Sequence, residues 1–105
     1  MHLSNPFSEQ IRFLFFDVWE CWQCGSNGNG RGGLELHHIK GRESNSALNA
    51  APLCHYCHEH MNHNSQEESF LMGKTIRFLV RINYDFDSND LAFYNQYKKI
   101  YDTLV

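Results

Sequence analysis

The 105-residue chain lacks several features that would each point to a class of protein. It has no apolar run that approaches the roughly 18 residues of a membrane-spanning helix. It does not open with a basic stretch, an apolar stretch and a small-residue cleavage site, which together mark a secreted protein. It also lacks an excess of positive charge, because nine Lys and Arg residues face twelve Asp and Glu residues. We therefore expect a cytoplasmic protein without a membrane partner.

The missing positive charge bears on nucleic-acid binding. Proteins gain most of their non-specific affinity for DNA by neutralising phosphates, so DNA binders are usually basic. With a net charge of -3, this chain should bind DNA weakly by itself. A bound divalent cation, a partner protein or a local basic face could supply the missing attraction. The residues that could form such a face, rather than an ordinary solvated surface, are Arg31, Lys40, Arg42, Lys74, Arg77 and Arg81.

The four cysteines form two C-x-x-C pairs, Cys21 with Cys24 and Cys54 with Cys57. Each pair turns tightly enough to aim two sulfurs at one ion, so together they predict a tetrahedral zinc site. In a reducing compartment such pairs usually bind metal, whereas in a small secreted protein they would form two disulfides, and that alternative stays open. Four thiolates leave no position for water, so the zinc would be structural and would stabilise the fold.

The pattern of apolar residues predicts one domain, residues 1–105, of the α+β class. Residues 34–39 and 50–53 are the strand candidates, and they suggest a hairpin with a wide loop. Residues 25–33 hold five of the seven glycines and predict a loop rich in turns. Four helices are predicted. The first covers residues 6–19 and is capped by Asn5, and the second covers about 56–62. The third covers about 66–82, with a capping box at 65–68 and an end near Asn83, and the fourth begins between residues 88 and 90 and runs towards residue 104. The packing side of the last helix would be Leu91, Tyr94, Tyr97, Ile100, Tyr101 and Leu104.

Two adjacent histidines, His37 and His38, lie between the cysteine pairs, and His58 follows the second pair directly. Near pH 7 an imidazole can either bind a metal or accept a proton. Consecutive residues of a regular strand point to opposite faces, so the adjacent pair can serve one site only if the pleat is broken there. We therefore expect His37 and His38 at the end of the first strand, where the chain enters the loop.

In order and spacing, three segments, 16–25, 36–39 and 49–58, resemble the zinc-containing branch of the HNH endonucleases. The resemblance rests on the paired histidines of a strand, on Asn49 five residues before a cysteine, and on His58 directly after the second cysteine pair. It covers about residues 11–63 and implies the ββα-metal fold of that family. The predicted C-terminal helical extension, about residues 65–105, lies outside it.

The resemblance also implies roles for these residues. His37 would bind a catalytic Mg²⁺ or Mn²⁺, His38 would act as the general base that takes a proton from water, and His58 would be the second metal ligand. Asn49 would bridge the two sides of the loop and hold the base in position, unless it is an ordinary turn residue. The reaction would cleave or nick DNA and leave 5′-phosphate and 3′-hydroxyl ends.

Helical geometry selects a candidate for the third metal ligand. If the helix continues past His58, Asn62 lies about 40° from it around the helix axis, whereas His60 lies about 160° away. His63, about 140° away, is no better placed. We therefore expect Asn62 to complete the site, with His60 and His63 as exposed polar residues.

Two departures from the family pattern concern the residues that would contact DNA. A proline often found two residues after Ile39 is absent, and Glu59, His60 and Met61 stand where basic residues are common. Lys40 and Arg42 then become the leading phosphate contacts, with solvated loop charges as the alternative.

Two other classes of function stay open. The chain could be a non-catalytic zinc module that binds nucleic acid or protein. It could also be a nuclease that works only inside a larger assembly, such as a phage packaging or recombination machine. In that case the C-terminal helices, rich in Tyr and Phe, would be candidates for a docking surface, although packing against the core is their ordinary use.

Overall fold

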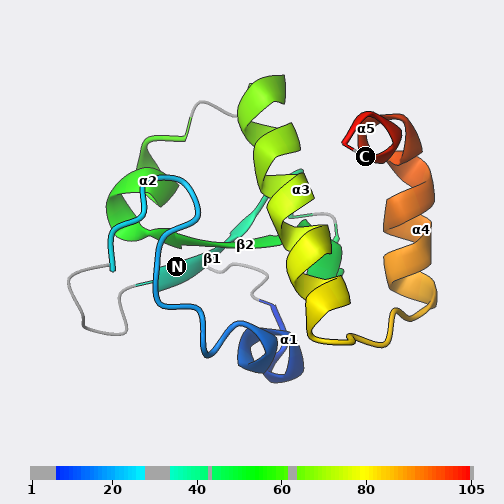
Figure 1. The fold of residues 1–105 in the computed structure, drawn as a ribbon, viewed down its shortest axis with the longest axis horizontal. Helices are drawn as coiled ribbons and strands as arrows, with labels where there is room; N and C mark the ends of the chain where they lie inside the picture. Colours follow the sequence, from blue (N-terminus) through cyan, green and yellow to red (C-terminus); the bar gives the residue numbers. More distant parts are fainter. Residues whose placement is uncertain (1–6, 28–33, 43, 62–63, 105) are drawn as a thin grey trace.

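The structure is a computed structural model that describes residues 7–27, 34–42, 44–61 and 64–104. It has the predicted α+β fold, in which a two-stranded antiparallel sheet is combined with five α-helices in the part of the chain described. The elements, in chain order, are α1 (Glu9–Leu14), β1 (Leu34–His38), the 3₁₀ helix η2 (Ala47–Asn49), β2 (Ala50–Cys54), α2 (His55–Glu59), α3 (Ser65–Arg81), α4 (Ser88–Gln96) and α5 (Lys98–Thr103). In Figure 1, α2 lies at one end of the hairpin, α3 runs across it, and α4 and α5 lie beyond α3.

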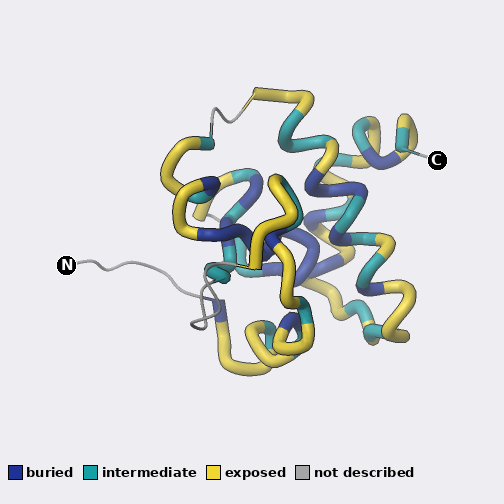
Figure 2. The backbone as a smooth tube through the Cα atoms, turned by 60° about the vertical axis from the view of Figure 1, so that its left-hand side comes forward, coloured by how far each residue is buried: buried dark blue, intermediate teal, exposed yellow. Residues whose placement is uncertain are grey.

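The hairpin was predicted, and its register is regular. The pairing runs from Leu34 opposite Cys54 to His38 opposite Ala50. All five residues of β2 are buried, and Figure 2 shows that the buried segments of the chain gather in the interior of the molecule. The outer edge of β2 is also occupied, because the Trp22 N–H donates to the Pro52 carbonyl at 3.1 Å and the Thr75 hydroxyl donates to the Ala50 carbonyl at 2.8 Å.

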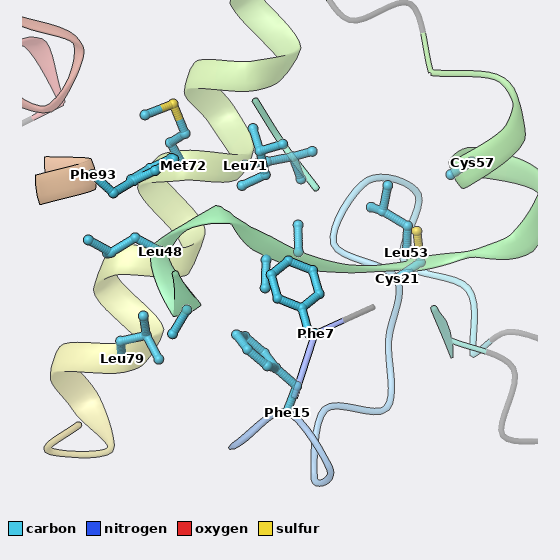
Figure 3. Packing of buried hydrophobic residues seen from close by; sticks show 14 of the residues in the cluster. Phe7, Phe15, Cys21, Leu48, Leu53, Cys57, Leu71, Met72, Leu79 and Phe93 are labelled. Carbon is cyan, nitrogen blue, oxygen red and sulfur yellow. The ribbon is translucent and has the colours of Figure 1, made fainter. Parts of the chain in front are cut away.

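The core lies between the hairpin and α3, with contributions from both ends of the chain. The helix α3 buries Leu71, Met72, Thr75 and Leu79. Figure 3 shows three groups of side chains around β2: those of α3, those of the N-terminal segment, and Phe93 from α4. The labelled members of this cluster are Phe7, Phe15, Cys21, Leu48, Leu53, Cys57, Leu71, Met72, Leu79 and Phe93.

The first helix is shorter than predicted at both ends. Instead of residues 6–19 it covers Glu9–Leu14, because the Ser8 side chain accepts a hydrogen bond from the Ile11 N–H and caps the helix there. Asn5, the predicted cap, lies outside the described residues. After Leu14 the chain forms turns that lead to Cys21, while Phe15 packs in the core.

The predicted helix at 66–82 is confirmed as α3, but its cap is different. Asn64, rather than Ser65, caps the helix by accepting a hydrogen bond from the Glu67 N–H at 2.8 Å. The predicted stop is confirmed, because Asn83 has φ +58°, a left-handed conformation that ends a helix.

The last predicted helix is in fact two helices, α4 and α5, separated at Tyr97. Tyr97 has φ -114° and ψ 27°, outside the α region, and its ring packs on Phe93 at 4.8 Å between ring centroids. The predicted packing side is wrong at Leu91, which is 55% exposed, because Phe93 is the residue buried instead. None of the helices in the described part of the chain has both the length and the apolar character needed to span a membrane.

Candidate functional site

The four cysteines gather at the end of the hairpin where Leu34 pairs with Cys54. Their sulfur atoms all lie within 4.8 Å of one another, and none forms a disulfide. A tetrahedral zinc ion with Zn–S bonds of about 2.3 Å requires sulfurs about 3.8 Å apart. The Cys24 and Cys54 sulfurs are 3.8 Å apart, so the donor set fits zinc as predicted. Within the described residues, this is the one group of three or more Cys, His, Asp or Glu side chains close enough to share an ion.

Each C-x-x-C pair is shaped by backbone N–H groups that point at sulfur. Gln23 donates to the Cys21 sulfur and Cys57 donates to the Cys54 sulfur, both at 3.4 Å. Hydrogen bonds from Ser26 lower the pKa of Cys24 to about 6, whereas burial raises the pKa of the Cys57 thiol. Because zinc binds thiolates, its binding must displace the Cys57 proton, which makes metal binding dependent on pH.

The predicted metal ligands His37 and His58 are brought together by the fold. His37 comes from β1 and His58 from α2, and their rings meet edge to face with centroids 5.2 Å apart. His37 is buried, and its Nε2 atom is buried with it. The contact brings together two imidazole rings from different elements.

Glu35 is a member of this cluster that the sequence analysis missed. Its carboxylate accepts hydrogen bonds from His58 Nδ1 at 2.6 Å and from His55 Nδ1 at 2.9 Å. Partial burial opposes ionisation of Glu35, but the two histidines outweigh it and hold the pKa of the carboxyl group below its usual range. With Nδ1 of His58 bound to the carboxylate, the Nε2 atom is left for a metal. The signal was present, since residues two apart in a strand share a face and Glu35 stands two before His37.

His38, the predicted base, ends β1 as expected, but the pleat is not broken there. Both histidines stay in regular register with β2, and their rings have different neighbours. The ring of His38 stacks on Phe7 with centroids 3.9 Å apart, and its Nε2 lies 2.8 Å from Asn45 Oδ1. Burial lowers the pKa of His38, as do the charges of Arg42 and His58, against the opposing effect of Asn45. A neutral ring that donates from Nε2 keeps Nδ1 as its proton acceptor.

Asn49 bridges the two sides of the loop between the strands, as the prediction of its role requires. Its side-chain oxygen accepts from the Lys40 N–H at 2.8 Å, and its side-chain nitrogen donates to the Gly41 and Ser44 carbonyls at 2.9 and 2.8 Å. Asn49 is fully buried, so the amide uses its hydrogen-bonding groups within the protein. The residue therefore fixes the loop that follows His38.

The two predicted phosphate contacts differ in their surroundings. Lys40 is mostly buried, with its ammonium 2.6 Å from a Glu68 carboxylate oxygen and 5.1 Å from the centre of the Tyr97 ring. Arg42 is exposed and close enough to His38 to influence its pKa. Lys40 thus connects the loop to α3 and to the α4–α5 junction.

The helical argument for the third metal ligand fails, because α2 ends at Glu59 with His60 as its C-cap. Asn62 lies outside the described residues, as does His63. His60 is exposed, stacks on Tyr56 with ring centroids 4.2 Å apart, and pairs its Nδ1 with the Tyr56 carbonyl. These contacts are with Tyr56 and not with His37 or His58, and His60 is an exposed polar residue, as the sequence analysis expected.

The arrangement can therefore do two kinds of chemistry. The pair formed by His37 and His58 lies near the cysteines, because Cys57 and His58 are neighbours in α2, whereas His38 ends β1 at the other end of the hairpin. The cysteine end can hold a structural zinc ion. The histidines offer two imidazoles in contact and a carboxylate that orients one of them. Separately, His38, with a lowered pKa, lies beside a loop fixed by an asparagine. Comparisons with protein-family models, with curated proteins and with solved structures found no match for this chain.

Proposed function

We propose that this chain is a metal-dependent endonuclease of the HNH type, which hydrolyses phosphodiester bonds of DNA. The observation that carries the proposal is the contact between His37 and His58, which lie 21 positions apart in the sequence and on different elements. A purely structural zinc module has no need for this contact, because its four cysteines already complete the zinc site.

The divalent cation of this proposal is supported by two imidazole donors that contact each other. His37 and His58 would hold it, whereas Asn62 has lost the support of helical geometry, because α2 ends at Glu59. When bound, Mg²⁺ or Mn²⁺ supplies Lewis-acid stabilisation of negative charge on the phosphate and on the departing oxygen. The carboxylate of Glu35 keeps the His58 ring in one tautomer and one orientation, so that the nitrogen left over faces away from Glu35.

His38 would act as the general base. Its ring has other neighbours than the ring of His37, but it lies close enough to His58 for the charge of that residue to help lower its pKa. Its lowered pKa keeps the ring neutral at pH 7, so that Nδ1 can take a proton from water. Asn45 holds Nε2, and Phe7 holds the plane of the ring. Asn49 fixes the start of the loop through the Lys40 N–H, so the base keeps its position relative to the strand.

Two observations favour a second candidate function, a binding module without catalysis that belongs to a larger assembly. Lys40 is paired with Glu68 rather than exposed to a ligand, and the chain carries a net charge of -3. A protein with this charge would need a partner to hold it on DNA, as in a larger assembly that handles phage DNA.

The test is a nicking assay on supercoiled plasmid with the zinc-loaded protein in Mg²⁺ or Mn²⁺. We expect the wild-type chain to nick the plasmid and His38→Ala to lose at least about 100-fold in rate, since general-base catalysis contributes roughly 10²–10⁴-fold. The matched control is His60→Ala, the same change at an exposed histidine, which should keep the wild-type rate. DNA ligase should reseal the nicks directly, because the ends carry a 5′-phosphate and a 3′-hydroxyl.

Two results would count against the proposal. Equal nicking by wild type and His38→Ala, with equal zinc content, would remove His38 as the base. No metal-dependent nicking by the wild type, with zinc bound and over a range of salt concentrations, would favour the binding module.

A further inference from the structure

The carboxylate of Asp90 is the most fully bonded side chain in the C-terminal part of the described structure. Asp90 is 1% exposed and lies in the first turn of α4. One oxygen, Oδ1, accepts from the Ser46 hydroxyl at 2.6 Å and from the Ala47 N–H at 3.2 Å. The other, Oδ2, accepts from the Tyr84 hydroxyl at 2.7 Å and from the Asp87 N–H at 3.0 Å.

The two oxygens connect different parts of the molecule. The bonds to Oδ2 stay next to α4, where Asp87 and Asp90 form a capping box. A capping box uses the side chain at this position to accept from the cap residue's own N–H, which Oδ2 does here. The bonds to Oδ1 go instead to Ser46 and Ala47, more than 40 positions earlier in the chain. Capping of α4 therefore does not account for the contact of Oδ1.

Ser46 passes this contact on to the loop that precedes β2. Its hydroxyl accepts from the Leu48 N–H at 3.0 Å, and its carbonyl accepts from the Asn49 N–H at 2.9 Å, so Ser46 caps η2. The Asn49 side chain then holds the Lys40 N–H and the Gly41 carbonyl. Hydrogen bonds thus run without a break from α4 to the loop that follows the proposed base.

We propose that Asp90 is a positioning residue for the histidine site: its carboxylate fixes Ser46 and η2, and through them the Asn49 amide and the loop that follows His38. The inference rests on the proposed function. It gives the C-terminal helices a role in the reaction, although they lie outside the segment that resembles the HNH endonucleases. The four hydrogen bonds that the Asp90 carboxylate accepts come from Ser46, Ala47, Tyr84 and Asp87, so Asp90 would act on the histidines only through the loop.

A matched pair of variants tests this role. Ser46→Ala and Tyr84→Phe each remove one hydroxyl that donates to the Asp90 carboxylate, but only the Ser46 hydroxyl leads to the loop. We expect Ser46→Ala to lower kcat about tenfold, with KM for plasmid DNA changed less than about twofold, which is typical for a residue that orients an active group. Tyr84→Phe should keep the wild-type kcat even if its unfolding temperature falls.

Hydrogen exchange provides a readout that does not depend on activity. In Ser46→Ala the amides of Lys40 and Asn49 should exchange at least about tenfold faster. The Ser46 carbonyl and the Asn49 side chain accept from these amides, and both would be less fixed once the hydrogen bond from the Ser46 hydroxyl to Asp90 is lost. The His37 amide in β1 should keep its wild-type rate, as should both loop amides in Tyr84→Phe. Asp90→Asn, if it folds, should resemble Ser46→Ala more than Tyr84→Phe.

The outcomes separate this inference from the proposed function. If Ser46→Ala and Tyr84→Phe lower kcat equally in proportion to their loss of stability, Asp90 is a structural residue and the inference is wrong. Unchanged exchange at Lys40 and Asn49 in Ser46→Ala also overturns it. If the wild type proves inactive while Ser46→Ala still loosens those two amides, the proposed reaction fails, but the hold of Asp90 on the loop is confirmed.

Discussion

The two ends of the β1–β2 hairpin are held by different means. At the end where Leu34 pairs with Cys54, four sulfur atoms lie close together, and a bound metal ion would link them. At the end where His38 pairs with Ala50, the loop is closed by the protein's own buried hydrogen bonds, centred on Asn49 and Asp90. One end of the sheet should therefore depend on zinc, while the other should keep its shape without it.

The largest expected effect is the loss of zinc. Cys57→Ser leaves three thiols and should reduce the free energy of unfolding by more than about 5 kcal/mol, because binding of a structural metal is a large part of the folding energy of small domains. Zinc content by mass spectrometry and thermal unfolding would measure this. In wild type titrated with a weak chelator, exchange should rise first near Cys21 and Cys54. A simultaneous rise at the Lys40 amide would show that the two ends are not independent.

The next effect in size concerns the loop end. Asn49→Ala removes the partner of three partly buried hydrogen bonds, those of the Lys40 N–H and of the Gly41 and Ser44 carbonyls, which should cost about 3 kcal/mol in urea unfolding. Zinc content should stay at the wild-type level, because the cysteines lie at the other end. The control is Asn95→Ala, an exposed asparagine of α4, with an expected change below about 0.5 kcal/mol. Loss of zinc in Asn49→Ala would contradict the separation.

A smaller effect depends on pH. Burial would raise the pKa of Asp90, but the hydrogen bonds from Ser46, Asp87 and Tyr84 outweigh it and hold the pKa below its usual range. Because the unfolded carboxyl titrates near 3.9, the stability that it contributes is present above that pH and is lost as the pH falls through the lower, folded pKa. Asp90→Asn should cost about 2 kcal/mol at pH 7, since hydrogen bonds to a charged group are lost.

The measurement is the urea midpoint of wild type and Asp90→Asn between pH 7 and pH 3, compared as a difference. Zinc release in acid affects both proteins, so the difference reports the carboxylate. It should be constant above about pH 5 and shrink toward pH 3. A difference that grows as the pH falls would show that the pKa of Asp90 is raised, not lowered, in the folded protein.

The smallest effect on stability, with a larger one on metal binding, is expected at Glu35. This side chain is 42% exposed, so Glu35→Gln should change the unfolding free energy by less than about 1 kcal/mol. Binding of Mn²⁺ to the zinc-loaded protein should weaken about tenfold, because the carboxylate that orients His58 is lost. Calorimetry would measure the affinity, with Glu59→Gln, which contacts His55 alone among these groups, as the control. Equal affinities in both variants would remove Glu35 from the site.

The sequence predicted the parts of the molecule that depend on local patterns. The cysteine spacing predicted the sulfur cluster, the strand candidates 34–39 and 50–53 predicted the hairpin, and the resemblance to the HNH endonucleases implied that Asn49 bridges the loop after His38. Each of these follows from neighbours along the chain or from a fixed motif.

The parts that were missed depend on contacts between distant segments. The sequence around Asp90 does not predict its hydrogen bond with Ser46. The helix break at Tyr97 is not predicted either, because that residue is neither Gly nor Pro. The shortness of α1 and α2 has a similar origin, because turns that deliver side chains to the core overrode helix periodicity. For Glu35 the strand period placed it beside His37, but only the fold brings His58 and His55 to it.

The occupied outer edge of β2 affects how readily the protein would aggregate at high concentration. A two-stranded sheet with an open side invites other chains to add strands to it, which is a common route to aggregation. Here Trp22 and Thr75 already hold the Pro52 and Ala50 carbonyls, and a proline offers no N–H for an incoming strand. The hairpin is thus shielded from edge-to-edge growth on that side by side-chain and loop contacts, without the third strand that larger sheets would use.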